Sequence, residues 1–594
     1  MNDLSPASIR QRAIDYIGVA AADGDEAVAL KRALAALRVY SNDAEITVIT
    51  CMLLNDWQRF EDSLALLYAL RTTDPERVEP ALAETYEAMH RIEDALAIRH
   101  EIYRKRPEHP LSHFQYIRSL LRAGEFQLAE SELRQFERFG RPKMEWQLRR
   151  LLLNRQHRRL EALELIESGP AGNPDDPAVA GALLQQLMML CKKDGDAFAK
   201  ERARGILDDL DLSEPSVLDR WLPLIRLALT LDRHDDVKVL LDLMPHGSRT
   251  RGVLEVRAWA AHKSGDVEQA RTLWDEIRAK NPIPQVRPCW ADELTRVDGQ
   301  SMGSAAGEIR LFTVIRNELW RLPWFLEYYR SRGVDRFFFV DNDSTDGSRE
   351  WLLDQAEVHV FSTNNSYALG KSGMVWVNAL MGEFGVDGWN IYVDVDEALV
   401  FPGIEQSSIR HLTDYMDRNG HDLAAGQMVD MFSRNPSTLG AGEYEHDFIE
   451  SYPYFDNSYY RTSTRYCPYY FTSGGARRRF GAGENQTKTP IVRGGRNIQF
   501  LSSSHMVTPG VISDVSVALL HFKLAGNFQK QANEDAIVNN RTVACRLRYQ
   551  AYADFMERVP AGQIDMSNND THRFRSSQTL VDLGLISAPA SFGF

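Results

Sequence analysis

The chain has 594 residues and a formal net charge of −14 at pH 7. This length exceeds what one hydrophobic core ordinarily supports, so roughly two to four domains are expected. Apolar residues make up 44% of the chain and charged residues 26%, as is typical of soluble globular proteins. The acidic balance argues against general nucleic-acid binding, which requires basic surface for phosphate contacts.

Cysteine usage and hydropathy bear on the cellular compartment. Five scattered cysteines show no CxxC or metal-ligand spacing, which predicts reduced thiols. The N-terminal segment has no apolar run behind basic residues, so no signal peptide is expected. No stretch approaches the roughly eighteen apolar residues of a transmembrane helix. We therefore expect a cytoplasmic protein whose only membrane association is peripheral, at the inner membrane.

A repeating pattern occupies the first half of the chain. From about residue 8 to 280, Ala, Leu, Glu and Arg recur at helical spacing. The segment 91–96 is echoed at 125–130 and again at 159–163, so the offset is 34 residues each time. Over residues 20–280 this pattern resembles tetratricopeptide repeats, which implies helix pairs stacked into a solenoid.

Such a solenoid usually presents a concave surface to a protein partner. The same pattern also fits a bare helical scaffold or a self-association element, and the sequence leaves both open. Small residues at the echoes, Ala95, Ala129 and Ala270, fit places where helices approach closely.

The pattern changes near residue 280. Residues 279–284 (AKNPIP) end the helical rhythm, and short Val, Ile and Phe-rich strands alternate with amphipathic helices after Glu308. The sequence predicts a helical repeat domain over 1–298, a linker over 299–307, an α/β domain over 308–558 and a polar, poorly ordered tail over 559–594.

The α/β part opens with a βαβ unit. Residues 309–318 are predicted as a strand, 320–332 as a helix and 335–341 as the next strand, and parallel pairing of the strands requires cover on both faces. Open α/β sheets bind ligands beyond the carboxyl ends of their strands. Polar residues follow three of the predicted strands there: Arg316, Asp341, Asp343 and Asp394.

The stretch 392–401 (YVDVDEALVF) carries most of the chemistry. A hydrophobic strand delivers Asp394, Asp396 and Glu397 within four residues, and alternation along an extended segment would put the two aspartates on one face. Two close carboxylates are costly to bury unpaired, so they favour a cation. Oxygen ligands suit Mg²⁺ or Mn²⁺. The alternative is a solvated acidic turn.

Several motifs of the second half carry a family likeness. The segment 340–348 (VDNDSTDGS) resembles the VDDGSTDGT segment of family-2 glycosyltransferases, which have the GT-A fold. The stretches RNE (316–318), GWNIYVDVDEALVFP, SGGARRRF and ALLHFK (518–523) occur in the family's order. The likeness spans about 309–530. It implies a transferase that moves a sugar from a nucleotide-sugar donor to a hydroxyl of a glycan or lipid-linked acceptor, in bacterial polysaccharide, lipopolysaccharide or capsule synthesis.

The resemblance also implies roles for particular residues. Asp394 and Asp396 match the Asp-x-Asp that holds Mn²⁺ or Mg²⁺ and, through it, the donor diphosphate. His521 matches a late histidine that completes the metal shell, although by itself it also fits a hydrogen-bonded core residue. The remaining donor-binding candidates are Arg316, Asn317, Glu318, Asp341, Asp343, Lys371 and Lys523.

The general base is less clear, because the family's Glu-Asp pair is not evident and inversion is left open. Asp430 and His505 are favoured because both follow predicted strands; Asp456 and Glu484 are further candidates. The tyrosine-rich stretch 444–470 suits either packing on a sugar ring or pinning a loop. The basic run at 477–479 suits either an anionic ligand or solvent.

Two other functions fit the same sequence. The chain could be an interaction scaffold whose transferase domain is degenerate. It could also glycosylate proteins, with the helical repeats presenting the polypeptide acceptor.

Overall fold

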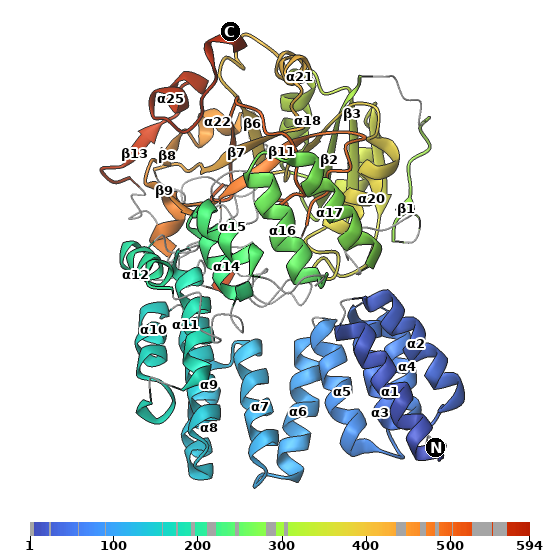
Figure 1. The fold of residues 1–594 in the computed structure, drawn as a ribbon. Helices are drawn as coiled ribbons and strands as arrows, with labels where there is room; N and C mark the ends of the chain where they lie inside the picture. Colours follow the sequence, from blue (N-terminus) through green and yellow to red (C-terminus); the bar gives the residue numbers. More distant parts are fainter. Residues whose placement is uncertain are drawn as a thin grey trace. The chain divides into compact units, whose positions relative to one another are not determined.

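The structure is a computed structural model. It describes residues 5–22, 25–56, 59–89, 91–156, 158–173, 176–191, 196–210, 221–243, 249–280, 291, 293–301, 307–434, 447–463, 471–480, 486–501, 503–525, 549–550 and 567–593. The chain forms two compact units that divide between residues 284 and 285. The predicted order, helical repeats followed by a mixed α/β unit, is confirmed (Figure 1).

The first unit consists of antiparallel helix pairs. Its α-helices are α1 (Pro6–Ala22), α2 (Glu26–Val39), α3 (Ala44–Asp56), α4 (Phe60–Leu70), α5 (Pro75–Ala88), α6 (Ile92–Lys105), α7 (Pro110–Ala123), α8 (Phe126–Phe136), α9 (Pro142–Arg155), α10 (Arg159–Ser168), α11 (Pro177–Met189), α12 (Ala197–Asp208), α14 (Trp221–Thr230), α15 (His234–Asp242), α16 (Arg251–Lys263) and α17 (Val267–Lys280). The second helices of three successive pairs begin at residues 92, 126 and 159. These intervals match the period read from the sequence, so the unit is tetratricopeptide-like.

Local sequence explains where these helices begin. Pro75, Pro110 and Pro142 each occupy a first-turn position, where a missing N–H costs no hydrogen bond. Asp74 caps α5 by accepting a hydrogen bond from the backbone N–H of Arg77. The prolines therefore start the next helix of the array as well as ending the previous one.

Small residues allow neighbouring helices to approach closely. Ala95, Ala129 and Ala270 are at most 1% exposed, as the repeat pattern predicts. Each lies near the start of the second helix of a pair, where a larger side chain would separate the helices.

The second unit is built on a mixed sheet. Its strands are β1 (Thr295–Arg296), β2 (Ile309–Ile315), β3 (Arg336–Asp341), β4 (Val358–Ser362), β5 (Trp389–Tyr392), β6 (Glu397–Val400), β7 (Leu423–Asp430), β11 (Thr487–Arg493) and β12 (Val517–His521). The order across the sheet is β1-β4-β3-β2-β5-β11-β7-β12-β6. The strands β4, β3, β2 and β5 are parallel, β11 is antiparallel to both of its neighbours, and β12 is parallel to β7.

Helices cover both faces of the parallel half, as buried parallel strands require. On one face, α18 (Leu322–Arg330) and α21 (Ile409–Arg418) pack against Leu311, Phe337 and Phe339. On the other face, α20 (Met374–Phe384) packs against Phe312 and Phe338. The alternation of β2 and β3 residues between the two cores follows from the two-residue period of a strand.

The sheet curves strongly beyond β5. Only residues 393–396 join β5 to β6, yet three strands separate the two in the sheet order. In a flat sheet, β5 and β6 would be four strand spacings of about 4.8 Å apart, or about 19 Å, which is more than the chain from residue 392 to 397 could span even when extended. The curvature brings the ends of β7, β11 and β12 towards the same short connection.

Two predicted boundaries differ in the structure. β1 pairs with β4, and the side chain of Asp298 accepts a hydrogen bond from the backbone N–H of Val360, so the α/β unit includes residues that the sequence assigned to the repeats. The described end of the tail is folded: β13 (Thr571–Arg573) pairs with β8 (Tyr454–Asp456). Its polarity was misleading because a few apolar residues, such as Phe592, bury against the sheet unit.

Candidate metal and donor site

The acidic stretch is a turn between two distant strands. β5 ends at Tyr392, and the backbone N–H of Glu397 donates to the carbonyl of Asp394 at 3.0 Å, which closes a tight turn. The predicted alternation of Asp394 and Asp396 on one extended strand is therefore wrong. The two carboxylates instead take different partners on different strands.

Strand register aligns the polar residues across the curved sheet. His521 pairs with Asp430 of β7 on one side and with Glu397 of β6 on the other. Directly paired residues project from the same face of a sheet. Three groups far apart in the sequence therefore form one row at the strand ends.

His521 lies between two carboxylates. Its Nδ1 is 2.6 Å from Asp430 Oδ1, and its Nε2 is 3.5 Å from Asp396 Oδ2. Burial opposes protonation, but the two carboxylates raise the pKa of His521 above its usual value. A hydrogen bond from Nδ1–H to Asp430 fixes the ring and directs Nε2 to Asp396.

Asp430 is saturated with donors. Arg477 donates to both of its carboxylate oxygens, at 2.9 and 3.0 Å, and Gln486 Nε2 donates at 2.7 Å. Burial raises its pKa, but the Arg477 guanidinium and His521 outweigh this and bring it to about 2. A carboxylate held in this way is a weak proton acceptor, which disfavours Asp430 as a general base. Arg477 is buried rather than a solvated surface residue.

A lysine that the sequence did not single out neutralises the other two acids. Lys488 on β11 places its Nζ 2.6 Å from Asp394 Oδ2 and 2.6 Å from Glu397 Oε1. The Tyr392 hydroxyl donates to Asp394 Oδ1 at 2.9 Å. Burial raises the pKa of Glu397 to about 7, whereas Lys488 overcomes burial and lowers the pKa of Asp394.

The residues present fit a divalent cation. Asp396, Glu397 and His521 are buried, and their ligand atoms lie within 4.8 Å of one another. Two ligands bound at about 2.1 Å and 90–110° apart would be about 3.0–3.4 Å from each other, close to the 3.5 Å between His521 and Asp396. A metal-binding histidine usually donates its other N–H to a carboxylate, as His521 does to Asp430.

Two loops form the neighbouring edge of the parallel strands. Asn317, after β2, accepts a hydrogen bond from the N–H of Thr345 and donates its own N–H to the Ser344 hydroxyl. Glu318 N donates to the Ser348 hydroxyl. Asn317 therefore ties the two loops together, a structural role that the sequence did not indicate.

Asp341 at the end of β3 has an unsatisfied oxygen. The carboxylate is fully buried; Oδ1 accepts the N–H of Ser344, whereas Oδ2 has no hydrogen bond and lies 3.6 Å from Arg349 Nη1. Burial raises the pKa of Asp341. A buried acceptor of this kind at a strand end fits a ligand that supplies a donor.

The other residues predicted to bind the sugar donor have their own local surroundings. Arg316 and Asp343 are exposed, and Asp343 has a left-handed backbone with φ of 62°. Glu318 forms a local ion pair with Arg321 at 2.6 Å, and burial raises its pKa. Lys371 precedes α20 with φ of 51°. These assignments stay predictions.

His505 lies in a turn rather than after a strand. Its Nδ1 donates to the backbone carbonyl of Thr487 at 2.9 Å, and burial, with the nearby charge of Lys488, lowers its pKa to about 3. The ring is therefore neutral with Nε2 as an acceptor. Asp456 accepts a hydrogen bond from the Thr571 hydroxyl, a structural contact, and Glu484 lies outside the described residues.

Sequence reasoning missed Lys488, and no local signal could have found it. It is one residue of an ordinary strand, and only the curvature of the sheet brings it to the acidic turn. Asp394, Asp396 and His521 were identified because they belong to motifs.

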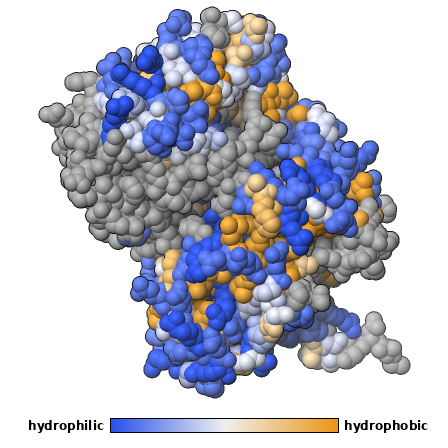
Figure 2. Space-filling view, turned by 90° about the vertical axis from the view of Figure 1, so that its left-hand side faces the viewer, coloured by the Kyte–Doolittle hydropathy of each residue, from blue (hydrophilic) through white to orange (hydrophobic). Residues whose placement is uncertain are grey.

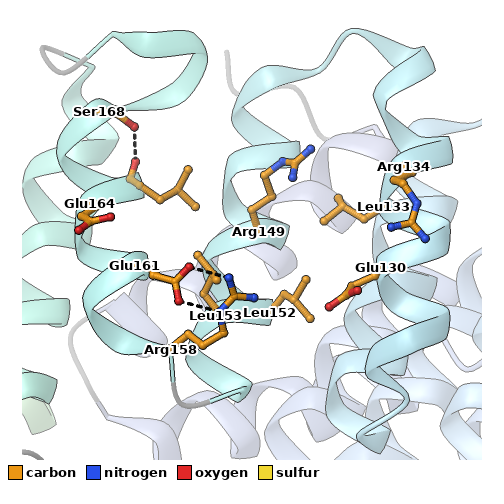
Figure 3. Close-up of a pocket in the computed structure, with 11 residues that line it drawn as sticks. Glu130, Leu133, Arg134, Arg149, Leu152, Leu153, Arg158, Glu161, Glu164 and Ser168 are labelled. Atoms are coloured by element: carbon orange, nitrogen blue, oxygen red, sulfur yellow. Dashed lines mark hydrogen bonds and ion pairs between the residues drawn. The ribbon is translucent and has the colours of Figure 1, made fainter.

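A separate cavity of about 520 Å³ lies in the helical unit between α8, α9 and α10 (Figure 3). Leucines line it together with charged residues of both signs, and Arg158 forms an ion pair with Glu161 at its edge. Exposed apolar side chains also occur on these elements, such as Leu128 and Leu160. Figure 2 shows hydrophobic areas within a mostly hydrophilic surface.

No protein-family model matches the chain, and no curated protein matches it. A tetratricopeptide repeat protein from Parabacteroides merdae covers 46% of this chain and 93% of its own, at 12% identity and a TM-score of 0.27.

Two further solved structures give matches of the same kind. The APC/C hetero-tetramer Cut9-Hcn1 covers 47% of this chain at 15% identity and a TM-score of 0.25, and this chain spans 54% of it. Naa15/Naa10 bound to HypK-THB covers 45% at 15% identity and a TM-score of 0.20, with 52% of that chain matched. Among the helices that the structure describes, none has the length and apolarity needed to span a bilayer.

Proposed function

We propose that the chain is a metal-dependent glycosyltransferase that moves a sugar from a nucleotide-sugar donor to a hydroxyl acceptor. The observation that carries the proposal comes from the row of residues at the strand ends. There, Asp430 holds the His521 ring towards a second carboxylate, that of Asp396. This arrangement is how proteins orient a histidine that binds a metal.

The position of this row in the fold supports the proposal. The parallel strands run in the order β4-β3-β2-β5, so the connections reverse direction between β2 and β5. Open α/β sheets bind nucleotides in the crevice at such a point. Asp341, with its unsatisfied oxygen, and the acidic turn after β5 both lie at carboxyl ends of these strands.

Different side chains would have different roles in the reaction. Asp396 and His521 would hold Mn²⁺ or Mg²⁺, with Asp394 or Glu397 as a further oxygen ligand. The ion, when bound, supplies positive charge that stabilises the departing nucleoside diphosphate. Asp341 and the loops around Asn317 would bind the nucleoside. Asp430 is held by Arg477, and burial lowers the pKa of His505 to about 3, so both are weak proton acceptors and no general base is assigned.

The helical repeats would bring the transferase to a partner. Their described surface includes the leucine-lined cavity beside α9 and exposed apolar side chains, both of which suit a polypeptide. We place the protein in the cytoplasm, acting on a glycan or lipid-linked acceptor. A polypeptide acceptor presented by the repeats would be equally compatible with this surface.

A second candidate function is an interaction scaffold with an inactive transferase domain. One observation favours it: Lys488 already neutralises Asp394 and Glu397 without an ion. The two candidates differ in whether the chain turns over a sugar nucleotide.

Hydrolysis of a panel of sugar nucleotides by the purified chain, with and without Mn²⁺, separates them. The transferase predicts slow, metal-dependent release of a nucleoside diphosphate that Asp396→Ala abolishes. Asp387→Asn, an exposed substitution in the turn before β5, serves as the matched control and should retain folding and metal dependence. If the folded chain neither hydrolyses any sugar nucleotide nor is stabilised by one, the interaction scaffold is the candidate function that remains.

A further inference from the structure

Lys488 occupies an unusual place for a lysine. Its side chain is 2% exposed, on a strand flanked on both sides, and its ammonium donates two hydrogen bonds of 2.6 Å to carboxylates. Burying an ammonium is costly unless anions and acceptors surround it. Asp394 and Glu397 supply both.

The same carboxylates belong to the donor set of the candidate metal site. Glu397 shares a cluster with Asp396 and His521, and Glu397 Oε2 also accepts the N–H of Asp394 at 3.0 Å. Asp394 Oδ1 accepts the Tyr392 hydroxyl. An ion that recruits Asp394 or Glu397 therefore competes with the ammonium of Lys488 for the same carboxylates and meets its positive charge, whereas Asp396 and His521 face each other without Lys488.

We propose that Lys488 is an internal counter-ion that competes with the divalent cation for Asp394 and Glu397, and so sets the metal affinity of the site. This inference rests on the proposed metal-dependent function. The ammonium keeps three clustered carboxylates compatible with folding before metal binds. It also weakens metal binding, because the ion has to compete with the ammonium for the same carboxylates.

The position of Lys488 makes this competition specific. β11 lies between β5 and β7, and the backbone of Lys488 pairs with Gly426 of β7. Lys523, at 4.0 Å from Asp396, is a looser neighbour at the same acidic group. In the part of this unit that the structure describes, Lys488 bridges two acids, each at hydrogen-bond distance.

The test measures Mn²⁺ binding directly, by titration calorimetry and by the electron paramagnetic resonance of free Mn²⁺. We expect Lys488→Met to bind Mn²⁺ about tenfold or more tightly than the natural chain, because no buried ammonium has to be displaced. Lys488→Arg keeps the charge and should show no gain. Without metal, Lys488→Met should melt at a lower temperature than the natural chain, and saturating Mn²⁺ should raise its melting temperature by more.

Each outcome decides the inference. Unchanged or weaker Mn²⁺ binding by a folded Lys488→Met would overturn it and leave Lys488 a structural ion pair. If Lys488→Met does not fold, the double variant Lys488→Met with Glu397→Gln removes one of the unpaired charges, and it should bind Mn²⁺ about tenfold more tightly than Glu397→Gln alone. Failure of every variant to bind Mn²⁺ would overturn the competition together with the metal site. Mn²⁺ binding without sugar-nucleotide hydrolysis would overturn the proposed function alone.

Discussion

Asp430 holds the His521 ring in its orientation, and Arg477 keeps Asp430 ionised. The three side chains form a buried chain of hydrogen bonds of 2.6 to 3.0 Å. Each member is satisfied by the next, so removal of one leaves the others with unpaired buried charge. The chemistry of His521 therefore depends on residues that touch no ligand.

Asp430→Asn tests this dependence. The substitution keeps the shape but removes the anion, so we expect Mn²⁺ affinity to fall about 10- to 100-fold. Stability should fall by about 3 kcal/mol because Arg477 is left as an uncompensated buried charge. Mn²⁺ titration and denaturant unfolding measure the two effects. Asp387→Asn, exposed in the turn before β5, is the control, and equal metal affinity in both variants would contradict the positioning role.

His262 gives a pH dependence in the helical unit. Burial beside Trp259 lowers its pKa from 6.5 to about 4, so the folded chain keeps this ring neutral where the unfolded chain protonates it. Its contribution to stability is therefore present above pH 6.5 and is lost as the pH falls towards 4.

Replacement of His262 by Leu should remove this pH-dependent contribution to the free energy of unfolding. We expect the loss of stability between pH 7 and pH 5 to be smaller in His262→Leu by about 1 to 2 kcal/mol. Denaturant unfolding at the two pH values measures it. His234→Leu, at the start of α15, is the matched control. An identical loss in His262→Leu and the natural chain would show that another group titrates.

At the scale of elements, the site depends on how closely β7 and β12 approach. Gly426 on β7 faces the backbone of β12, where an added Cβ would lie 2.2 Å from the carbonyl oxygen of Val517. No side chain can fit there without displacing one strand. Asp430 and His521 lie at the ends of these two strands, so their contact follows from a glycine four residues away.

Gly426→Ala should therefore damage both the fold and the site. We expect a loss of about 1 to 3 kcal/mol from forced separation of the strands, with weaker Mn²⁺ binding. Gly382→Ala is the matched control, because this glycine lies inside α20 with nothing within 4 Å of the added Cβ. It should gain about 0.5 to 1 kcal/mol from helix propensity. Equal stability of the two variants, measured by thermal unfolding, would contradict the close approach.

At the scale of the whole molecule, each unit has its own core. The helical unit buries its leucines and alanines between successive helices, and the α/β unit buries its apolar residues on the two faces of the sheet. The proposed chemistry lies entirely in the second unit. The chain divides between residues 284 and 285.

Expression of residues 285–594 alone tests this division. We expect the fragment to fold, to bind Mn²⁺ as the full chain does and to retain sugar-nucleotide hydrolysis. The full chain should show two thermal transitions, of which Mn²⁺ shifts only one. An insoluble fragment, or one that loses Mn²⁺ binding while the full chain keeps it, would show that the repeats complete the site.

The sequence by itself determined the helical repeats, the α/β class and the acidic cluster that follows β5. Helical periodicity, the 34-residue offset and the strand-end motifs around Asp341 and Asp394 are local patterns, and local patterns are set by neighbours in the chain. Asp396 and His521 could be predicted for the same reason, because each lies in a short motif at the end of a strand.

Only the tertiary structure decided how the charges pair. Lys488, Arg477 and Asp430 are separated from their partners by 44 to 94 residues, and the curvature of the sheet brings them together. Periodicity says which residues of a strand share a face, but it says nothing of which strands become neighbours. For that reason the sequence placed Asp394 and Asp396 on one face, whereas the fold pairs Asp394 with Lys488 and Asp396 with His521.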